Sequence, residues 1–186
     1  MVKAAAEVFV DEGYAGATIE QLAARAGVSR PTVFGVGSKA QLFALARQRA
    51  ATGGRLTAND EGFQRLLAIP DAHRLLEAFA AFTAAISRRL GPLERVLGQA
   101  AGADPELAQL QESSQQELLE CARGVVAAAA ATGSLRREIP GQAAADLLWL
   151  QIQPANYRCL VEERGWSHHA FERWHAAAMI AALLEP

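Results

Sequence analysis

The sequence predicts an all-α fold of about nine helices, with a small N-terminal head (residues 1–50) and a larger helical body (residues 51–186). Apolar residues recur every three or four positions, which is the spacing of one face of a helix. No stretch alternates apolar and polar residues over the length of a strand, and β-branched residues are sparse. Glycine, proline and capping residues divide the chain into segments of helical length.

Composition and charge narrow the possible functions. The 186 residues are 51% hydrophobic and 20% charged, which is typical of a globular protein with a buried core. The net charge of −2 gives no overall basic balance. Residues 1–55, however, carry seven basic against four acidic groups, whereas the remainder carries 11 basic against 16 acidic groups. A basic head on an acidic body is expected if only the head contacts phosphate.

Several classes of protein are disfavoured. Cys121 and Cys159 have no second cysteine nearby, so neither a zinc ligand set nor a disulfide framework is indicated. Acidic residues near the N-terminus interrupt any signal peptide, and the longest uncharged apolar stretch, residues 125–131, is too short to span a membrane. We therefore expect a soluble, cytoplasmic protein without a cofactor or metal.

A pair of short helices is predicted near the N-terminus. Thr18 and Gln21 form a capping-box pattern that opens the first helix, and Gly27 suits the left-handed conformation that ends it. Ser29 caps the second helix, with Pro31 in its first turn. Such a pair is a helix-turn-helix, whose second helix can enter the major groove of DNA. A plain helical hairpin in an all-α core fits the same pattern.

The remaining elements follow from periodicity and breaks. A helix over residues 3–12, ended by Gly13, precedes the pair, and a capping box of Ser38 and Gln41 opens the helix that follows it. That helix runs toward Gly53-Gly54, where we place the joint between head and body. Body helices are predicted over residues 66–69, 71–90, 93–101, 105–131, 140–163 and from 167 onward.

Two prolines shape the predicted body. Gly91-Pro92 is expected to end the helix that Asp71 caps, and Pro154 to kink the helix over residues 140–163. The last two helices are rich in Leu, Trp and Ala, and faces with small residues often pair across a two-fold axis. Packing within one chain explains the same composition.

At this point the residues carry a family resemblance. The segment EVFVDEGYAGATIEQLAARAGVSRPTVF, followed by GSKAQLF, resembles the DNA-binding head of the TetR family of bacterial regulators. The segment AADLLWLQIQPANYRCLVEERGWSHHAFERW resembles the C-terminal end of one branch of that family. The resemblance implies a homodimer that binds a palindromic operator and releases it when a small ligand enters the body. It also implies that the last two helices form the dimer interface.

The resemblance assigns DNA contacts to Thr18, Ser29, Arg30, Pro31, Thr32, Phe34, Gly35 and Lys39. Thr18 and Lys39 would contact phosphate, and Arg30 is the best reader of a base because a guanidinium can bind guanine with two hydrogen bonds. The chain departs from the family pattern after Phe34, where it is one residue shorter and lacks an aromatic hydroxyl. We therefore expect a short recognition helix, in which Gly35 costs about 1 kcal/mol relative to alanine.

Two further sets of residues are candidates in the body. Candidates for an apolar effector pocket are Phe79, Phe82, Thr83, Ile86, Leu118, Cys121, Trp149 and Gln153. Candidates for the dimer interface are Leu147, Leu150, Tyr157, Phe171, Trp174, Ala178 and Ala181. Core packing is the alternative for each of them. The scarcity of ionic groups in these helices favours a neutral or weakly polar effector.

Two other classes of function were weighed. Glu172 and His175 form a Glu-x-x-His unit, with His168 one turn before it, as in di-iron bundles. Such sites need a second copy of the unit, and the sequence has none. No glycine-rich phosphate loop or nucleophile elbow is present, so we do not predict an enzyme. A helical adaptor that does not bind DNA is the remaining alternative.

Overall fold

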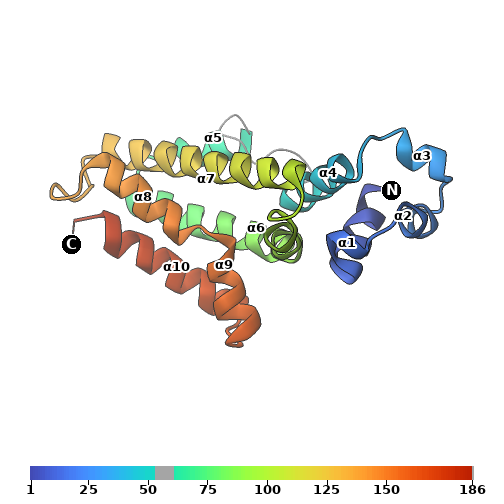
Figure 1. Ribbon diagram of the computed structural model, residues 1–186. Helices are drawn as coiled ribbons and strands as arrows, with labels where there is room; N and C mark the ends of the chain where they lie inside the picture. Colours follow the sequence, from blue (N-terminus) through green and yellow to red (C-terminus); the bar gives the residue numbers. More distant parts are fainter. Residues whose placement is uncertain (53–60, 186) are drawn as a thin grey trace. The chain divides into compact units, whose positions relative to one another are not determined.

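The computed structural model describes residues 1–52 and 61–185 (Figure 1). The predicted all-α class is confirmed: within these residues the structure has ten α-helices, one π-helical segment and an isolated bridge between Leu135 and Leu184. The helices are α1 (Val2–Gly16), α2 (Ile19–Ala26), α3 (Arg30–Phe34), α4 (Lys39–Thr52), α5 (Glu61–Leu67), α6 (Ala72–Ala100), α7 (Pro105–Ala131), α8 (Gly141–Gln151), α9 (Pro154–Tyr157) and α10 (His168–Leu183). The π-helical segment is Arg158–Glu163.

The described residues group into two compact units. The first unit holds α1–α4 together with Arg89–Ser114, which comprises the end of α6 and the start of α7. The second unit holds α5, α6 up to Arg88, and the chain from Gln115 onward. The division into domains at residue 50 stays a prediction, and the expected joint at Gly53-Gly54 lies outside the described residues.

Helix ends in the first unit follow the predicted caps. The Thr18 N–H donates to Gln21 Oε1 (2.8 Å), and the Gln21 N–H donates to Thr18 Oγ1 (3.2 Å). Ser38 and Gln41 make the same reciprocal pair, at 2.8 and 3.1 Å. Gly27 ends α2 in the left-handed conformation, with φ of 65°. These predicted caps are confirmed. They could be predicted from the sequence because each joins residues only a few positions apart.

An aromatic cluster forms the core between α1 and α4. Phe9 and Phe43 are fully buried and meet edge to face, with ring centroids 5.1 Å apart. Gly13 interrupts α1 at φ of 70°, as predicted, and one further turn of helix follows it. The reversal brings the Tyr14 ring to 5.9 Å from Phe9 and 5.7 Å from Phe43. The helix-turn-helix therefore rests on a platform of three packed aromatic rings.

Polar contacts hold α4 to the end of α6. Arg47 pairs with Glu94, and their side chains are only 12% and 19% exposed. Arg89 donates hydrogen bonds to the backbone carbonyls of Ala50 (3.2 Å) and Ala51 (2.7 Å) near the end of α4. Carbonyls at the end of a helix lack partners within that helix, so an arginine there satisfies them.

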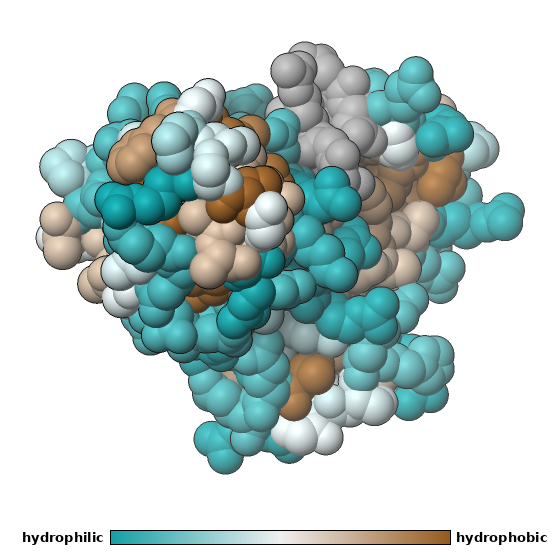
Figure 2. Space-filling view, turned by 90° about the vertical axis from the view of Figure 1, so that its right-hand side faces the viewer, coloured by the Kyte–Doolittle hydropathy of each residue, from teal (hydrophilic) through white to brown (hydrophobic). Residues whose placement is uncertain are grey.

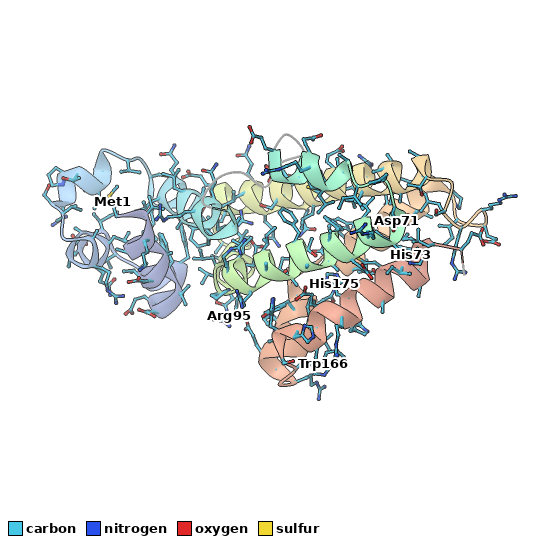
Figure 3. All side chains as sticks on the ribbon, turned by 180° about the vertical axis from the view of Figure 1, so that it is seen from behind. Met1, Asp71, His73, Arg95, Trp166 and His175 are labelled. Atoms are coloured by element: carbon cyan, nitrogen blue, oxygen red, sulfur yellow. The ribbon has the colours of Figure 1, made fainter. Side chains whose placement is uncertain are left out.

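The predicted break at Gly91-Pro92 is wrong. Asp71 begins α6 as expected, accepting from the Arg74 N–H at 2.8 Å (Figure 3), but the helix then continues without interruption to Ala100. Proline in a helix interior costs about 3 kcal/mol. Beyond the proline, Leu93 and Leu97 are 2% and 1% exposed, and their burial offsets that cost.

The predicted continuous helix over residues 140–163 is also wrong. It is divided into α8, α9 and the π-helical segment. The residue before a proline avoids the helical conformation, and Gln153 accordingly has ψ of 129° before Pro154. The Asn156 side chain donates to the carbonyls of Leu150 (2.9 Å) and Gln151 (2.8 Å), which the end of α8 leaves without helical partners. The break is therefore capped.

Two glycines near α3 allow a test of this local geometry. Gly37 has φ of 131°, and a Cβ there would lie 1.8 Å from Gln41 Oε1. We expect Gly37→Ala to lower the free energy of unfolding by about 1–3 kcal/mol, measured by urea denaturation followed by circular dichroism. The matched variant Gly35→Ala should raise it by about 0.4–1 kcal/mol, because φ at Gly35 is −63° and the nearest atom to a new Cβ is 3.4 Å away. Equal stability of the two variants would contradict this account.

Candidate nucleic-acid interface

The helix α3 presents nearly all of its side chains to solvent. Val33 is its one buried side chain, at 1% exposure, and it faces the rest of the head. Of the eight residues predicted to contact DNA, Lys39 is half-buried and the other seven are exposed. Figure 2 looks onto the side on which Figure 1 draws α2 and α3, and hydrophilic side chains cover most of the surface that it shows. The predicted set is therefore available to a partner.

The cap and the end of α3 confirm the expected short recognition helix. Ser29 Oγ accepts from the Thr32 N–H (3.3 Å) and lies 2.8 Å from Thr32 Oγ1. At the other end, the Gly35 N–H donates to the Pro31 carbonyl (2.9 Å), and α3 stops after five residues. The hydroxyls of Ser29 and Thr32 are engaged with each other. Arg30 and Phe34 are the long exposed side chains of this helix.

Arg30 forms an ion pair that the sequence did not reveal. Its Nη2 lies 2.8 Å from Glu20 Oε1, and the two side chains are 60% and 57% exposed. An exposed pair of this kind is worth about 0–1 kcal/mol, so the guanidinium can exchange the carboxylate for an acceptor on DNA. Sequence reasoning missed Glu20 because the pair crosses the turn between α2 and α3. A charge of opposite sign near the start of α2 was the available signal.

Lys39 lies in a polar cluster at the start of α4. Its ammonium sits 4.5 Å from the centroid of the Tyr14 ring, and burial lowers the pKa of Lys39 while the Asp104 carboxylate opposes that shift. Burial, followed by a hydrogen bond with Asp104, raises the pKa of Tyr14. The Ser38 hydroxyl donates to Glu106 (3.0 Å). Acidic residues at the start of α7 thus border the predicted phosphate contact, and their distance in sequence concealed them.

The predicted effector-pocket residues lie in the second unit. Buried members of the set are Phe79, Thr83, Ile86 and Cys121, and half-buried members are Phe82, Leu118, Trp149 and Gln153. The Thr83 hydroxyl donates to the Phe79 carbonyl (2.9 Å) within its own helix. Burial raises the pKa of Cys121 to about 11, so its thiol stays neutral. Gln153 exchanges hydrogen bonds with Gln115, at 3.1 and 3.2 Å. Apart from Thr83, Cys121 and Gln153, the set is apolar.

Trp149, predicted to line the effector pocket, also borders a hollow on the surface of α8. It lines a shallow hollow of about 490 Å³ together with Ala143, Asp146, Leu147 and Leu150. Two of these residues, Leu147 and Leu150, are 39% and 57% exposed and belong to the predicted dimer interface. The hollow therefore lies on the exposed side of α8.

The other predicted interface residues divide between surface and core. Trp174 is 39% exposed, Ala181 is exposed, and Ala178 is half-buried. Tyr157 and Phe171 are 4% and 1% exposed, and their rings meet edge to face at 4.9 Å in a core cluster with Ala84. We correct the assignment of Tyr157 and Phe171, because side chains enclosed within their own unit cannot contact a partner. The periodicity of a sequence identifies the apolar faces of a helix, but it does not tell which face packs in the core and which is left exposed.

The Glu-x-x-His unit of α10 does not form part of a metal-ligand cluster. Among residues 1–52 and 61–185, no group of three or more His, Cys, Asp or Glu side chains is arranged to hold a metal ion. The Nε2 atom of His168 lies 4.0 Å from Oε2 of Glu172. His175 on α10 (Figure 3) is 2% exposed, and neither of its ring nitrogens meets the geometric criteria for a hydrogen bond with any part of the chain that the structure describes. Burial lowers the pKa of His175 to about 4, because a charged ring would lose its hydration there.

The lowered pKa of His175 makes stability depend on pH. An unfolded histidine titrates near 6.5, so between pH 4 and 6.5 the unfolded chain binds more protons than the folded one. We expect the free energy of unfolding to fall by up to about 3 kcal/mol as pH drops through this window. His175→Leu should remove that part of the dependence, whereas His169→Gln, at an exposed position, should keep it. Denaturant titrations at pH 7 and pH 4.5 that give the same loss for His175→Leu and the parent protein would contradict the assignment.

None of the helices that the structure describes has the length and hydropathy of a membrane span.

One family model matches the N-terminal part of the chain. Residues 1–46 match the family model described as bacterial regulatory proteins, tetR family. No curated protein matches the chain. The matched residues include α1–α3, the start of α4 and every residue of the predicted DNA-contacting set.

Solved structures share the fold over nearly the whole chain. NalD, the secondary repressor of the MexAB-OprM multidrug efflux pump in Pseudomonas aeruginosa, is 21% identical with a TM-score of 0.76, covering 99% of this chain and 93% of NalD. A Saccharomonospora viridis protein described as a transcriptional regulator, in complex with choline, is 17% identical with a TM-score of 0.78, covering 100% and 96%. SmeT, the Stenotrophomonas maltophilia repressor of the SmeDEF efflux pump, in complex with triclosan, is 19% identical with a TM-score of 0.68, covering 99% and 90%.

Proposed function

We propose that this chain belongs to the tetR family of bacterial regulatory proteins, whose model matches residues 1–46, and that it is a ligand-responsive DNA-binding transcriptional regulator. In this proposal it acts in the cytoplasm as a homodimeric repressor that releases a palindromic operator when a small, largely apolar molecule binds the body. The observation that carries the proposal is the exposed, capped helix α3 on the basic head, with the Arg30 guanidinium paired with the exposed carboxylate of Glu20.

Contacts with DNA divide into positioning and reading. Lys39 and the Thr18 cap at the start of α2 would bind phosphates, since a helix N-terminus offers free N–H groups to an anion. Arg30 at the start of α3 would leave Glu20 and bind a guanine in the major groove. Phosphate contacts give affinity without sequence preference, so preference depends chiefly on α3.

A homodimer would place two such heads on one operator. A two-fold interface pairs the same surface of both chains, and the exposed apolar side chains of α8 and α10 provide a surface of this kind. Leu147, Leu150 and Trp174 are large hydrophobic residues with more than a third of their surface exposed. Their burial against a second copy would explain the shallow hollow on α8.

The effector site is proposed for the second unit. Its candidate lining is apolar, and the paired amides of Gln115 and Gln153 are polar groups that a weakly polar molecule could engage. Similar folds have been solved with choline and with triclosan, which are small molecules. Both α6 and α7 run from the second unit into the first. A ligand that displaces either helix would therefore act on the contacts Arg47–Glu94 and Ser38–Glu106.

This proposal gives the chain no catalytic role. The main alternative is a helical adaptor with lost or weak DNA binding, and it differs from a regulator in one measurable respect. Neutralising phosphates releases counterions, so DNA binding by a regulator weakens steeply with salt.

Selection of duplexes from a random pool by the full chain, followed by a salt titration, tests DNA binding. We expect an enriched palindrome whose binding constant falls with salt, and the slope of log K against log salt should drop by roughly 2 in Lys39→Ala, one phosphate per protomer. Arg30→Ala should broaden the preference at one position per half-site and weaken binding by about 1–3 kcal/mol. Failure to enrich any sequence would favour the adaptor.

Sedimentation at micromolar concentration tests the dimer. We expect a dimer for the parent chain and a monomer for Leu150→Glu, because burying an unpaired charge costs about 3 kcal/mol or more and raises the dimer Kd at least ~100-fold. Leu150 is 57% exposed, so the substitution should leave the monomer folded. The control Leu45→Glu changes a leucine of α4 that is 38% exposed and should stay dimeric. A parent chain that sediments as a monomer would refute the homodimer.

A further inference from the structure

Phe34 is an exposed aromatic side chain at the end of α3. It is 59% exposed, the highest value among the large hydrophobic residues that the structure describes as exposed. An aromatic ring left in water loses the free energy that its burial would contribute, about 1.5–3 kcal/mol for a full side chain. Its exposure on α3 is therefore unfavourable in the isolated protein, and it suggests a partner surface that covers the ring.

The geometry of α3 fixes where that surface lies. Arg30 and Phe34 are four residues apart on one helix, so their side chains share a face, roughly 5–6 Å apart at Cβ. Val33 is buried in the head, on the neighbouring side of the helix. Glu20 holds the Arg30 guanidinium at 2.8 Å. Whatever meets Arg30 must also meet Phe34.

The chemistry of the ring limits what it can recognise. Phe34 has no hydrogen-bonding group, so it can satisfy neither a phosphate oxygen nor the donors and acceptors on a base edge. The major groove offers one apolar group to such a side chain, the 5-methyl group of thymine. Successive base pairs are 3.4 Å apart, so the spacing of Arg30 and Phe34 corresponds to one or two base steps.

Resting on the proposed function, we propose that Phe34 is a specificity-determining residue that contacts the 5-methyl group of a thymine, one or two base pairs from the guanine bound by Arg30. The half-site is then read by one guanidinium and one aromatic ring on the same face of a five-residue helix. Thr32, whose hydroxyl is engaged with Ser29, adds little to this reading.

The test removes only the methyl group. The probe is the duplex selected from the random pool, with each thymine replaced singly by deoxyuridine, and its binding to the full chain is measured by fluorescence anisotropy at fixed salt. Burial of one methyl group is worth about fourfold in affinity. We expect one thymine per half-site to show this loss, within two base pairs of the position whose preference Arg30→Ala abolishes.

A comparison of variants assigns the methyl contact to Phe34. Phe34→Ala should bind the thymine and deoxyuridine duplexes equally, whereas Phe34→Leu should keep part of the difference because it stays apolar. The control Leu45→Ala removes another exposed apolar side chain of the head and should keep all of it. The substitution at Phe34 is at an exposed position, and thermal melting followed by circular dichroism checks that each variant is folded.

The outcomes separate this inference from the function on which it rests. An affinity indifferent to every thymine-to-deoxyuridine change, in a protein that binds the duplex, overturns the role of Phe34 and leaves the regulator intact. An undiminished difference in Phe34→Ala also overturns it, since another residue then contacts the methyl group. Failure to bind any duplex overturns both. The measurement on the parent chain is decisive for the methyl contact even if a variant unfolds.

Discussion

The edge-to-face contact of Phe9 and Phe43 is the interaction on which the head depends. A helix of five residues is far too short to be stable alone, so α3 takes its position from its neighbours. Val33 attaches it to the head through one buried side chain, and the capped turn at Gly27 fixes its direction relative to α2. The packing of α2 on α1, and of α1 on α4, then carries that direction back to the aromatic pair. The position of the exposed face of α3 therefore depends on the packing of the aromatic rings in the core of the head.

Local signals were readable from the sequence, and distant ones were not. The reciprocal caps at Thr18 and Ser38 involve partners three residues away, and both are present. The continuity of α6 through Pro92 was missed because burial of Leu93 and Leu97 depends on tertiary packing. The pairing of Arg30 with Glu20, and the acidic residues beside Lys39, depend on how separate helices meet. The predicted DNA-contacting residues stay a prediction, and the carboxylates that contact Arg30 and Ser38 came only from the structure.

The body shows a different limit. Its last two helices are apolar on more than one face, so periodicity alone does not divide core from interface. Phe171 and Leu150 read alike in sequence, yet one is 1% and the other 57% exposed. The break before Pro154 contributes to this difference in exposure. It separates α8 from α9, and Tyr157 of α9 packs against Phe171 in the core. A proline that was expected to bend one helix instead creates two, with separate packing surfaces.

The ion pair between Arg30 and Glu20 has a consequence for how the proposed regulator would search DNA. A guanidinium already paired with a carboxylate gains little from one more oxygen, since a lone phosphate replaces one anionic partner by another. A guanine offers two acceptors in the plane of the guanidinium, and that exchange is favourable. In the proposed regulator, breaking the pair with Glu20 would cost the same free energy at every sequence, so only a partner that binds the guanidinium more strongly than the carboxylate would displace Glu20. On DNA that offers Arg30 no guanine, the guanidinium would then stay paired with Glu20.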